Sequence, residues 1–201
     1  TSIEATETLS IEKLTRFVVD KYDERAGLRV KAWRNIINTA DTLDDQKKLF
    51  KANQFFNFFR FIDDIDHWGV KDYWATPIEF IGTSAGDCED FSIAKYFTLL
   101  EMGISPEKLR LTYVKALKLD QFHMVVAYYE TPTSMPVILD NIDPKIKPAA
   151  ERTDLVPIFS FNGQKLWLNK QKSSGQVVGS AERLSTWQDL RKRYQLDEFK
   201  Q

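Results

Sequence analysis

Apolar positions in the first third of the chain recur every three or four residues, which is the period of a helix with one buried face. A second stripe of this kind covers residues 30–37 and a third covers residues 43–56. Gly27 is the expected break between the first two helices. The first stripe consists of Ile11, Leu14, Val18 and Tyr22.

The middle of the chain combines an irregular segment with one further helix. Residues 55–62 are dense in aromatic side chains, which are expected to pack in the core. An irregular, tryptophan-rich segment follows and ends in a glycine-rich turn at residues 82–86. A helical period then runs from Cys88 to Met102, and Gly103 is a natural stop for that helix.

Beyond Gly103 the pattern changes to the alternation and β-branched or aromatic composition of strands. Asn162-Gly163 is a hairpin signal, and Ser185-Thr186-Trp187-Gln188 predicts a capping box that opens a terminal helix through Tyr194. We therefore predict an α+β fold, a single domain over residues 1–201, with N-terminal helices packed on an antiparallel sheet. The expected strands cover residues 109–114, 122–129, 137–139, 156–161 and 165–168.

Composition narrows the possible functions. The 201 residues are 43% hydrophobic and 28% charged, as in a globular protein with a substantial core. A net charge of −1 gives no basic surface for nucleic acid. No apolar stretch approaches the ~18–20 residues that cross a bilayer. The chain begins at Thr1 and shows no signal-peptide segment, which fits a mature secreted protein as well as a trimmed chain.

Cys88 is the only cysteine, and it lies where the helical pattern begins, in Gly86-Asp87-Cys88-Glu89-Asp90. Backbone N–H groups and the helix dipole at such a position favour the thiolate, the nucleophilic form. A lone cysteine is more often a small buried hydrophobe. Three carboxylates beside a core thiol make no packing sense, so this setting indicates a nucleophile.

His123 and Asp140 supply the other parts of a cysteine-nucleophile triad, in the expected order. His123 is the candidate base, and Asp140, at the end of a strand, is the candidate group that orients the imidazole. Alternation places His123 on the face of its strand that also bears Val125 and Ala127. We expect that face to pack on the helix that begins at Cys88.

Two residues of the irregular segment have open roles. His67 lies in an acidic, aromatic stretch and is the alternative base. Trp74 precedes Cys88 and has an indole N–H that can stabilise a tetrahedral oxyanion together with the Cys88 backbone N–H. Lining of a substrate groove is an equally open role for Trp74.

The carboxylates next to Cys88 raise the pKa of a neighbouring thiol, so they need a different explanation. Helix capping is one, with the first carboxylate as N-cap and the others complementing the dipole. A hard cation such as Ca²⁺ is another, with Asn141 and Asp143 as further oxygen donors. The two roles are compatible, and the spacing alone favours capping. The carboxylates concerned are Asp87, Glu89 and Asp90.

Several segments together resemble the bacterial transglutaminase-like cysteine proteinases, and especially their LapG type. The resemblance covers roughly residues 10–195. It implies a papain-like, transglutaminase-type fold. The matching segments are Asp72–Phe80, Gly86–Phe91, Lys95-Tyr96 with Leu99, Phe122–Val125 and Leu139–Asn141.

This resemblance also implies roles for individual residues. Cys88 becomes the nucleophile, His123 the base and Asp140 the orienting carboxylate. In LapG-type enzymes the carboxylates that flank the cysteine belong to a calcium site needed for activity, so capping alone no longer suffices. The implied Ca²⁺ ligands are Asp87, Glu89 and Asp90.

A biological setting follows from the same resemblance. It implies a periplasmic endopeptidase that cuts the N-terminal region of a large surface adhesin at a paired-alanine site and so releases a biofilm. It also implies an inner-membrane cyclic-di-GMP receptor of the LapD type that captures the enzyme. Two alternatives stay open from the residues: acyl transfer to an amine by the same triad, and a non-catalytic binding module on the same fold.

Overall fold

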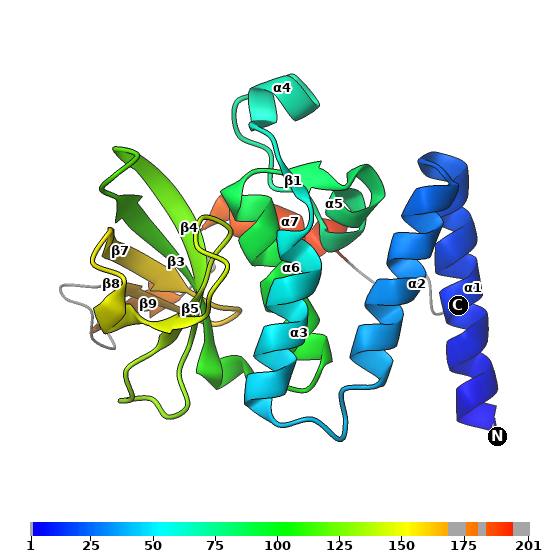
Figure 1. Cartoon of the computed structure of the whole chain (residues 1–201), viewed down its shortest axis with the longest axis horizontal. Helices are drawn as coiled ribbons and strands as arrows, with labels where there is room; N and C mark the ends of the chain where they lie inside the picture. Colours follow the sequence, from blue (N-terminus) through cyan, green and yellow to red (C-terminus); the bar gives the residue numbers. More distant parts are fainter. Residues whose placement is uncertain (1, 169–175, 181–183, 195–201) are drawn as a thin grey trace.

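The computed structural model describes residues 2–168, 176–180 and 184–194. Helices gather on one side of the molecule and a sheet on the other, and α1 and α2 form an antiparallel pair farthest from the sheet (Figure 1). Among the described residues, no helix combines the length and the apolar character needed to cross a membrane. The helices are α1 (Ser2–Lys21), α2 (Glu24–Asn38), α3 (Asp45–Asn57), α4 (Asp64–Trp68), α5 (Pro77–Thr83), α6 (Cys88–Glu101) and α7 (Ser185–Arg193), with 3₁₀ turns η1 (Pro106–Lys108) and η2 (Ala149–Glu151).

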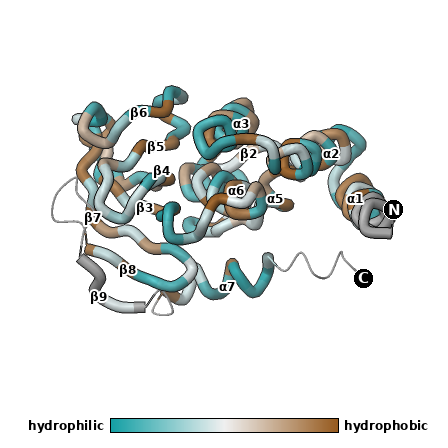
Figure 2. The backbone as a smooth tube through the Cα atoms, turned by 90° about the horizontal axis from the view of Figure 1, so that it is seen from below, coloured by the Kyte–Doolittle hydropathy of each residue, from teal (hydrophilic) through white to brown (hydrophobic). Residues whose placement is uncertain are grey.

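The main sheet has seven antiparallel strands in the order β6-β5-β4-β3-β7-β8-β9, which Figure 2 shows from one edge to the other. A separate parallel pair, β1 with β2, joins the chain before α4 to the residues before α6. The predicted α+β class with an antiparallel sheet is confirmed. The strands are β1 (Arg60–Phe61), β2 (Ala85–Gly86), β3 (Leu109–Ala116), β4 (Gln121–Tyr128), β5 (Val137–Leu139), β6 (Lys147–Pro148), β7 (Leu155–Phe161), β8 (Lys165–Leu168) and β9 (Gln176–Ser180).

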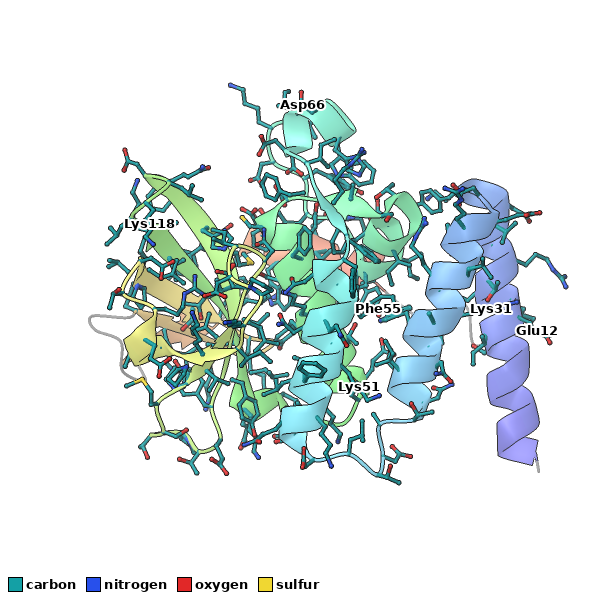
Figure 3. The ribbon with its side chains drawn as sticks, in the orientation of Figure 1. Glu12, Lys31, Lys51, Phe55, Asp66 and Lys118 are labelled. Atoms are coloured by element: carbon teal, nitrogen blue, oxygen red, sulfur yellow. The ribbon has the colours of Figure 1, made fainter. Side chains whose placement is uncertain are left out.

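Helix α6 occupies the centre of the molecule. It contacts β3 and β4 on one side and α3 and α5 on the other. Its apolar side chains are buried in a core that the helices share with one face of the sheet, and Trp33 and Phe56 are among the largest members of that core. In Figure 3, Glu12 and Lys31 project outwards from α1 and α2, while Phe55 of α3 packs against this core.

The break between the first two helices differs from the prediction. α1 ends at Lys21 and Asp23 is the N-cap of α2, so Gly27 lies inside α2 rather than between helices. A Cβ atom on Gly27 would lie 2.4 Å from a methyl group of Val19, so α1 and α2 approach more closely here than any side chain would allow. Gly27 therefore allows the two helices to pack closely. This tertiary contact outweighs the low helix propensity of glycine.

Helix ends also differ in two places. The segment before Cys88 is not irregular throughout, because it contains α5. Thr76 and Glu79 form the capping box of α5, with Pro77 in the first turn. The capping box expected at Ser185 is absent, because Leu184 is the N-cap of α7 and makes no side-chain cap.

The face of β4 that packs on α6 is the opposite of the expected one. Met124 and Val126 join the helix-side core, whereas Val125 and Ala127 belong to a second apolar cluster on the other face of the sheet. From Met124 on, the residues of β4 are buried on both faces. A strand buried on both faces carries no alternation that would tell the two sides apart.

Candidate active site

Cys88 is the first residue of α6, as the sequence predicts. Asp87 is the N-cap, its side chain accepts a hydrogen bond from the Asp90 backbone N–H, and the Asp90 side chain accepts one from the Asp87 N–H. This reciprocal capping box confirms the capping role considered for the acidic block. It fixes the first turn of α6 and with it the position of the thiol.

The Cys88 thiol donates a hydrogen bond to Glu89 Oε2 at 2.9 Å. Burial raises the pKa of Cys88 well above its usual value, and the charge and hydrogen bond of Glu89 add to this effect. A hydrogen bond from the backbone of Met124, the residue after His123, acts in the opposite direction. The thiol therefore contacts β4 beside His123.

His123 and Asp140 meet across β4 and the end of β5. His123 Nε2 lies 2.5 Å from Asp140 Oδ1, and both side chains are buried. The Asp140 carboxylate also accepts the Ile142 backbone N–H, which fixes its orientation. With Nε2 occupied by the carboxylate, Nδ1 is the ring nitrogen left for proton exchange.

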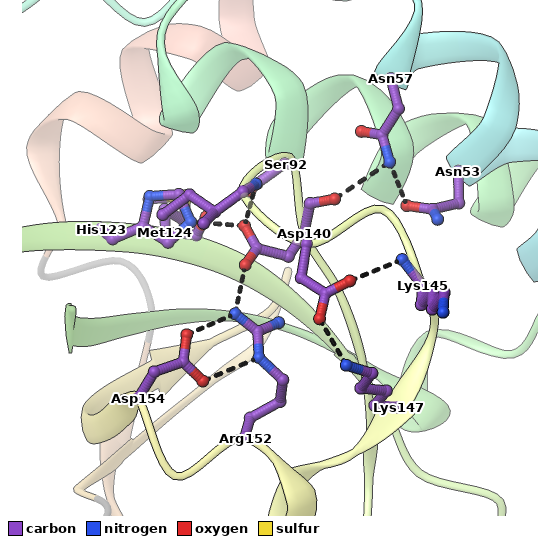
Figure 4. A network of polar contacts seen from close by, with 12 residues as sticks. Asn53, Asn57, Ser92, His123, Met124, Asp140, Lys145, Lys147, Arg152 and Asp154 are labelled. Carbon is purple, nitrogen blue, oxygen red and sulfur yellow. Dashed lines mark hydrogen bonds and ion pairs between the residues drawn. The ribbon is translucent and has the colours of Figure 1, made fainter. Parts of the chain in front are cut away.

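Arg152, which follows η2, completes this group and was not singled out from the sequence. Its Nη2 lies 2.7 Å from Asp140 Oδ2, and its Nε and Nη2 donate to the two oxygens of Asp154 (Figure 4). Burial raises the pKa of Asp140, but His123 and Arg152 outweigh it and hold that pKa well below its usual range. We call His123, Asp140, Arg152 and Asp154 the histidine cluster.

A second group gathers acidic side chains at the start of α6. One carboxylate oxygen from each of three residues lies within 4.8 Å of the others, and two of the three residues are buried. We call them the acidic cluster: Asp64, Asp87 and Asp90. Asp64 comes from α4, and sequence reasoning missed it although it stands in the acidic run of residues 63–66.

Charge in the acidic cluster has no compensating cation among the described residues. Burial raises the pKa of Asp87 to about 10 and that of Asp90 to about 8, and neighbouring carboxylates contribute to both shifts. Burial also raises the pKa of Asp64, whose Oδ1 is buried and finds no hydrogen-bond partner within the described part of the chain. Crowded, buried carboxylate oxygens of this kind fit a hard divalent cation such as Ca²⁺.

The other residues considered as calcium ligands lie elsewhere. Glu89 Oε1 accepts from the Tyr113 hydroxyl at 3.3 Å, and its second oxygen binds the thiol. Asp143 pairs with Lys147 at 2.7 Å and is not part of the acidic cluster. Asn141 Oδ1 is buried without a hydrogen-bond partner among the described residues.

Trp74 lines a cleft of about 480 Å³ together with aromatic residues of the sheet, including Tyr113, Phe122 and Phe159. Its indole Nε1 is buried and has no hydrogen-bond partner in the part of the chain that the structure describes. The cleft lies near the start of α6, because Tyr113 of its lining donates a hydrogen bond to Glu89, the residue after Cys88. Trp74 therefore lines the cleft and also offers a spare donor, so both roles considered for it stay compatible.

The loop that carries Trp74 is held on both sides. Asp64 accepts the Tyr73 backbone N–H at 2.5 Å and Asp90 accepts the Ala75 N–H at 2.9 Å, so two members of the acidic cluster flank Trp74. Arg193 of α7 donates to the Trp74 carbonyl at 2.6 Å.

His67, the alternative base, lies on α4. Its Nε2 is 3.0 Å from the Thr83 hydroxyl, and its ring packs on Trp68. These contacts account for His67 at the junction of α4 and α5, while the histidine with a carboxylate partner is His123.

A helix that begins with a cysteine, set against a strand with a His–Asp pair, is the arrangement of a papain-like cysteine proteinase. The sequence matches the family of bacterial transglutaminase-like cysteine proteinases (BTLCP) over residues 22–171, and the chain belongs to this family. It is accordingly a cysteine protease. A comparison with curated proteins finds no match.

The solved structures that are similar to this chain include LapG. The chain is 40% identical to Legionella pneumophila LapG, covering 92% of this chain and 97% of that one with a TM-score of 0.80. The EGTA-treated form of the same protein gives a TM-score of 0.81 with the same identity and coverage. Its calcium-bound form gives 0.79, with 40% identity and coverage of 92% and 99%.

Proposed function

We propose that this chain is a calcium-dependent endopeptidase of the LapG type in which Cys88, His123 and Asp140 form the catalytic triad. The observation that carries the proposal is the His123–Asp140 contact on the strand that also touches the Cys88 thiol. The 40% identity to LapG supports it.

In the proposed reaction, His123 takes the thiol proton through Nδ1 and Cys88 attacks the scissile carbonyl. The Cys88 backbone N–H and the Trp74 indole N–H stabilise the oxyanion. His123 then protonates the leaving amine, and water hydrolyses the acyl-enzyme. Throughout, Asp140 holds the proton on Nε2 and stabilises the imidazolium.

We assign the acidic cluster as the calcium site, with Asp64 replacing Glu89 in the ligand set expected from the sequence. The EGTA-treated and calcium-bound forms of LapG support this assignment. A bound calcium ion supplies positive charge beside the first turn of α6, which offsets the carboxylates that raise the pKa of Cys88. The capping box and a cation are compatible, because each carboxylate has two oxygens.

The proposed substrate is the N-terminal region of a large surface adhesin, cut at a paired-alanine site in the periplasm, with biofilm release as the outcome. A membrane-bound cyclic-di-GMP receptor of the LapD type is the proposed regulator. Both follow from the LapG resemblance. Small alanine side chains give little binding energy for selection, so the aromatic cleft would have to recognise neighbouring residues and the extended backbone.

The test is cleavage of an adhesin N-terminal fragment by the wild-type protein in calcium and in EGTA. We expect one discrete product in calcium and none in EGTA, and none from a Cys88→Ala variant whose circular dichroism matches wild type. A fragment with the alanine pair replaced by bulky residues is the matched substrate control. Cleavage by Cys88→Ala would refute the nucleophile, and full cleavage in EGTA would refute the calcium requirement. Incorporation of a labelled amine without cleavage would replace hydrolysis by acyl transfer.

A further inference from the structure

We propose that Arg152 is a positioning residue for catalysis, which fixes the Asp140 carboxylate in the orientation that His123 requires. This inference rests on the proposed function. Arg152 lies far from Cys88 in the sequence, and no motif in the chain marks it. Its role emerges only from the contacts of Figure 4.

Asp140 divides its two oxygens between two partners. Oδ1 is 2.5 Å from His123 Nε2, and Oδ2 is 2.7 Å from Arg152 Nη2. A carboxylate held at both oxygens cannot rotate about its terminal torsion, which is otherwise broad. Asp140 Oδ1 is therefore a fixed acceptor beside His123 Nε2. This acceptor selects the imidazole tautomer that carries its proton on Nε2.

Arg152 is itself held in position. The Asp154 carboxylate accepts from Arg152 Nε at 3.0 Å and from Nη2 at 2.9 Å, and the Arg152 side chain is only 3% exposed. The planar guanidinium thus bridges two carboxylates, a geometry that a lysine cannot reproduce. A buried ion pair of this kind contributes little net stability, which favours a positioning role over a purely stabilising one.

Other charged groups face Asp140 as well. Lys95 of α6 acts on it electrostatically, and its ammonium group donates to Asn57 Oδ1 at 2.7 Å. Asn57 in turn donates to the Asp140 backbone carbonyl at 3.0 Å. Lys95 therefore braces the backbone near Asp140, whereas Arg152 binds the carboxylate that meets the imidazole.

The first readout needs no substrate. The chain has two histidines, so selective ¹⁵N-histidine labelling gives two ring systems, and His67→Gln assigns them. In wild type we expect the neutral His123 ring as a single tautomer protonated at Nε2. In Arg152→Gln, which keeps a donor but loses the charge and the fork, we expect a mixture of tautomers.

The second readout is the pH profile of cleavage. Arg152→Gln should lower kcat by about tenfold or more with little change in KM, because only the transition state requires the oriented dyad. The acid limb of the profile should move to higher pH, since Asp140 loses the cation that keeps it ionised. Arg152→Lys keeps the charge and should restore the position of the acid limb, while kcat stays below wild type.

Lys147→Met is the matched control. It removes a cation five residues before Arg152, and this cation pairs with Asp143 instead of Asp140. It should behave as wild type in both readouts. A wild-type tautomer and an unmoved acid limb in Arg152→Gln would overturn the proposal. If Arg152→Gln does not fold, the variants Arg152→Lys and Asp154→Asn test the proposal in its place. A wild-type tautomer together with a wild-type kcat in both variants would overturn the proposal. If wild type cleaves no substrate, the proposed function fails, while the tautomer comparison still tests Arg152.

Discussion

Two clusters that each contain buried aspartates lie close to the same helix and behave in opposite ways. Asp140 and Asp90 are each only 1% exposed. Arg152 and His123 hold the pKa of Asp140 well below its usual range despite burial, whereas burial raises the pKa of Asp90 to about 8. Since the two aspartates are equally buried, burial does not explain the difference between their pKa values. The charge of the nearest partner explains it.

This difference separates two uses of a carboxylate. The histidine cluster contains its own cation, because Arg152 forms ion pairs with both of the cluster's carboxylates. The acidic cluster gathers negative charge without a cation among the described residues, so it is complete only with a cation from solution. The first arrangement suits a permanent catalytic group, and the second suits a site that responds to the concentration of an ion.

The largest expected effect comes from removing the charge of Asp140. Asp140→Asn should reduce kcat by about 10⁴-fold, because an amide no longer fixes the His123 tautomer. Unfolding in urea should show a loss of about 3–5 kcal/mol, since Arg152 loses a buried partner. Activity within tenfold of wild type would contradict the assigned role of Asp140.

The corresponding change in the acidic cluster should have the opposite effect on stability. Asp87→Asn keeps an N-cap side chain but removes a carboxyl group whose ionised form is disfavoured by burial and by neighbouring carboxylates, so in EGTA the variant should melt at a higher temperature than wild type. Calcium at about 100 times its Kd should stabilise wild type by about 2.7 kcal/mol, or roughly 5–10 °C. Asp87→Asn should show a much smaller shift. Differential scanning calorimetry with magnesium as the control ion measures both, and equal calcium shifts in the two proteins would contradict the ligand assignment.

Calcium-free stability should fall as the pH rises. Asp87 and Asp90 hold protons with pKa values of about 10 and about 8 when folded, against about 3.9 in the unfolded chain. The folded state therefore binds more protons between pH 4 and these values, and its stability is lost across that window. Melting temperatures from pH 5 to pH 8 in EGTA should decline, and calcium should flatten the decline. A rise of the melting temperature over this range in EGTA would contradict the raised pKa values.

The smallest effect is expected at Lys95. Burial lowers the pKa of Lys95 to about 7, despite the charge of Asp140. The folded state then binds fewer protons than the unfolded chain between about pH 7 and its usual value near 10.4, so this residue makes stability rise with pH there. Lys95→Met should lack that rise in urea unfolding at pH 7 and 9 in calcium. Its kcat should stay within about threefold of wild type, because Arg152 still holds the carboxylate. A pH slope identical to that of wild type would show that Lys95 keeps its usual pKa.

The sequence predicts the elements that depend on local pattern. The start of α6 at Cys88 was predictable because capping residues, a helical stripe and a final glycine agree over one short segment. α5 was also readable, since Thr76-Pro77-Ile78-Glu79 carries a capping box. Ser185 shows the limit of such signals, because the same residue types there lie inside the helix.

The partners of the functional residues were not predictable in the same way. Asp64 stands among several acidic residues, and only the path of α4 brings its carboxylate to Asp87. Arg152 follows a short 3₁₀ turn with no pattern of its own. The packing face of β4 was predicted wrongly, because a strand buried on both sides shows no alternation. Contacts between distant segments depend on tertiary structure, and a single sequence does not encode them as a period or a spacing.

The last described helix has a consequence for the timing of activity during synthesis. Trp187 of α7 is fully buried between aromatic residues of α6 and β7, and Arg193 binds the carbonyl of Trp74. Ribosomes make these residues after every member of the triad. Residues at the start of α7 line the cleft, so its wall stays unfinished until α7 has been made. A chain made only as far as the triad therefore has a nucleophile but no completed groove in which to use it.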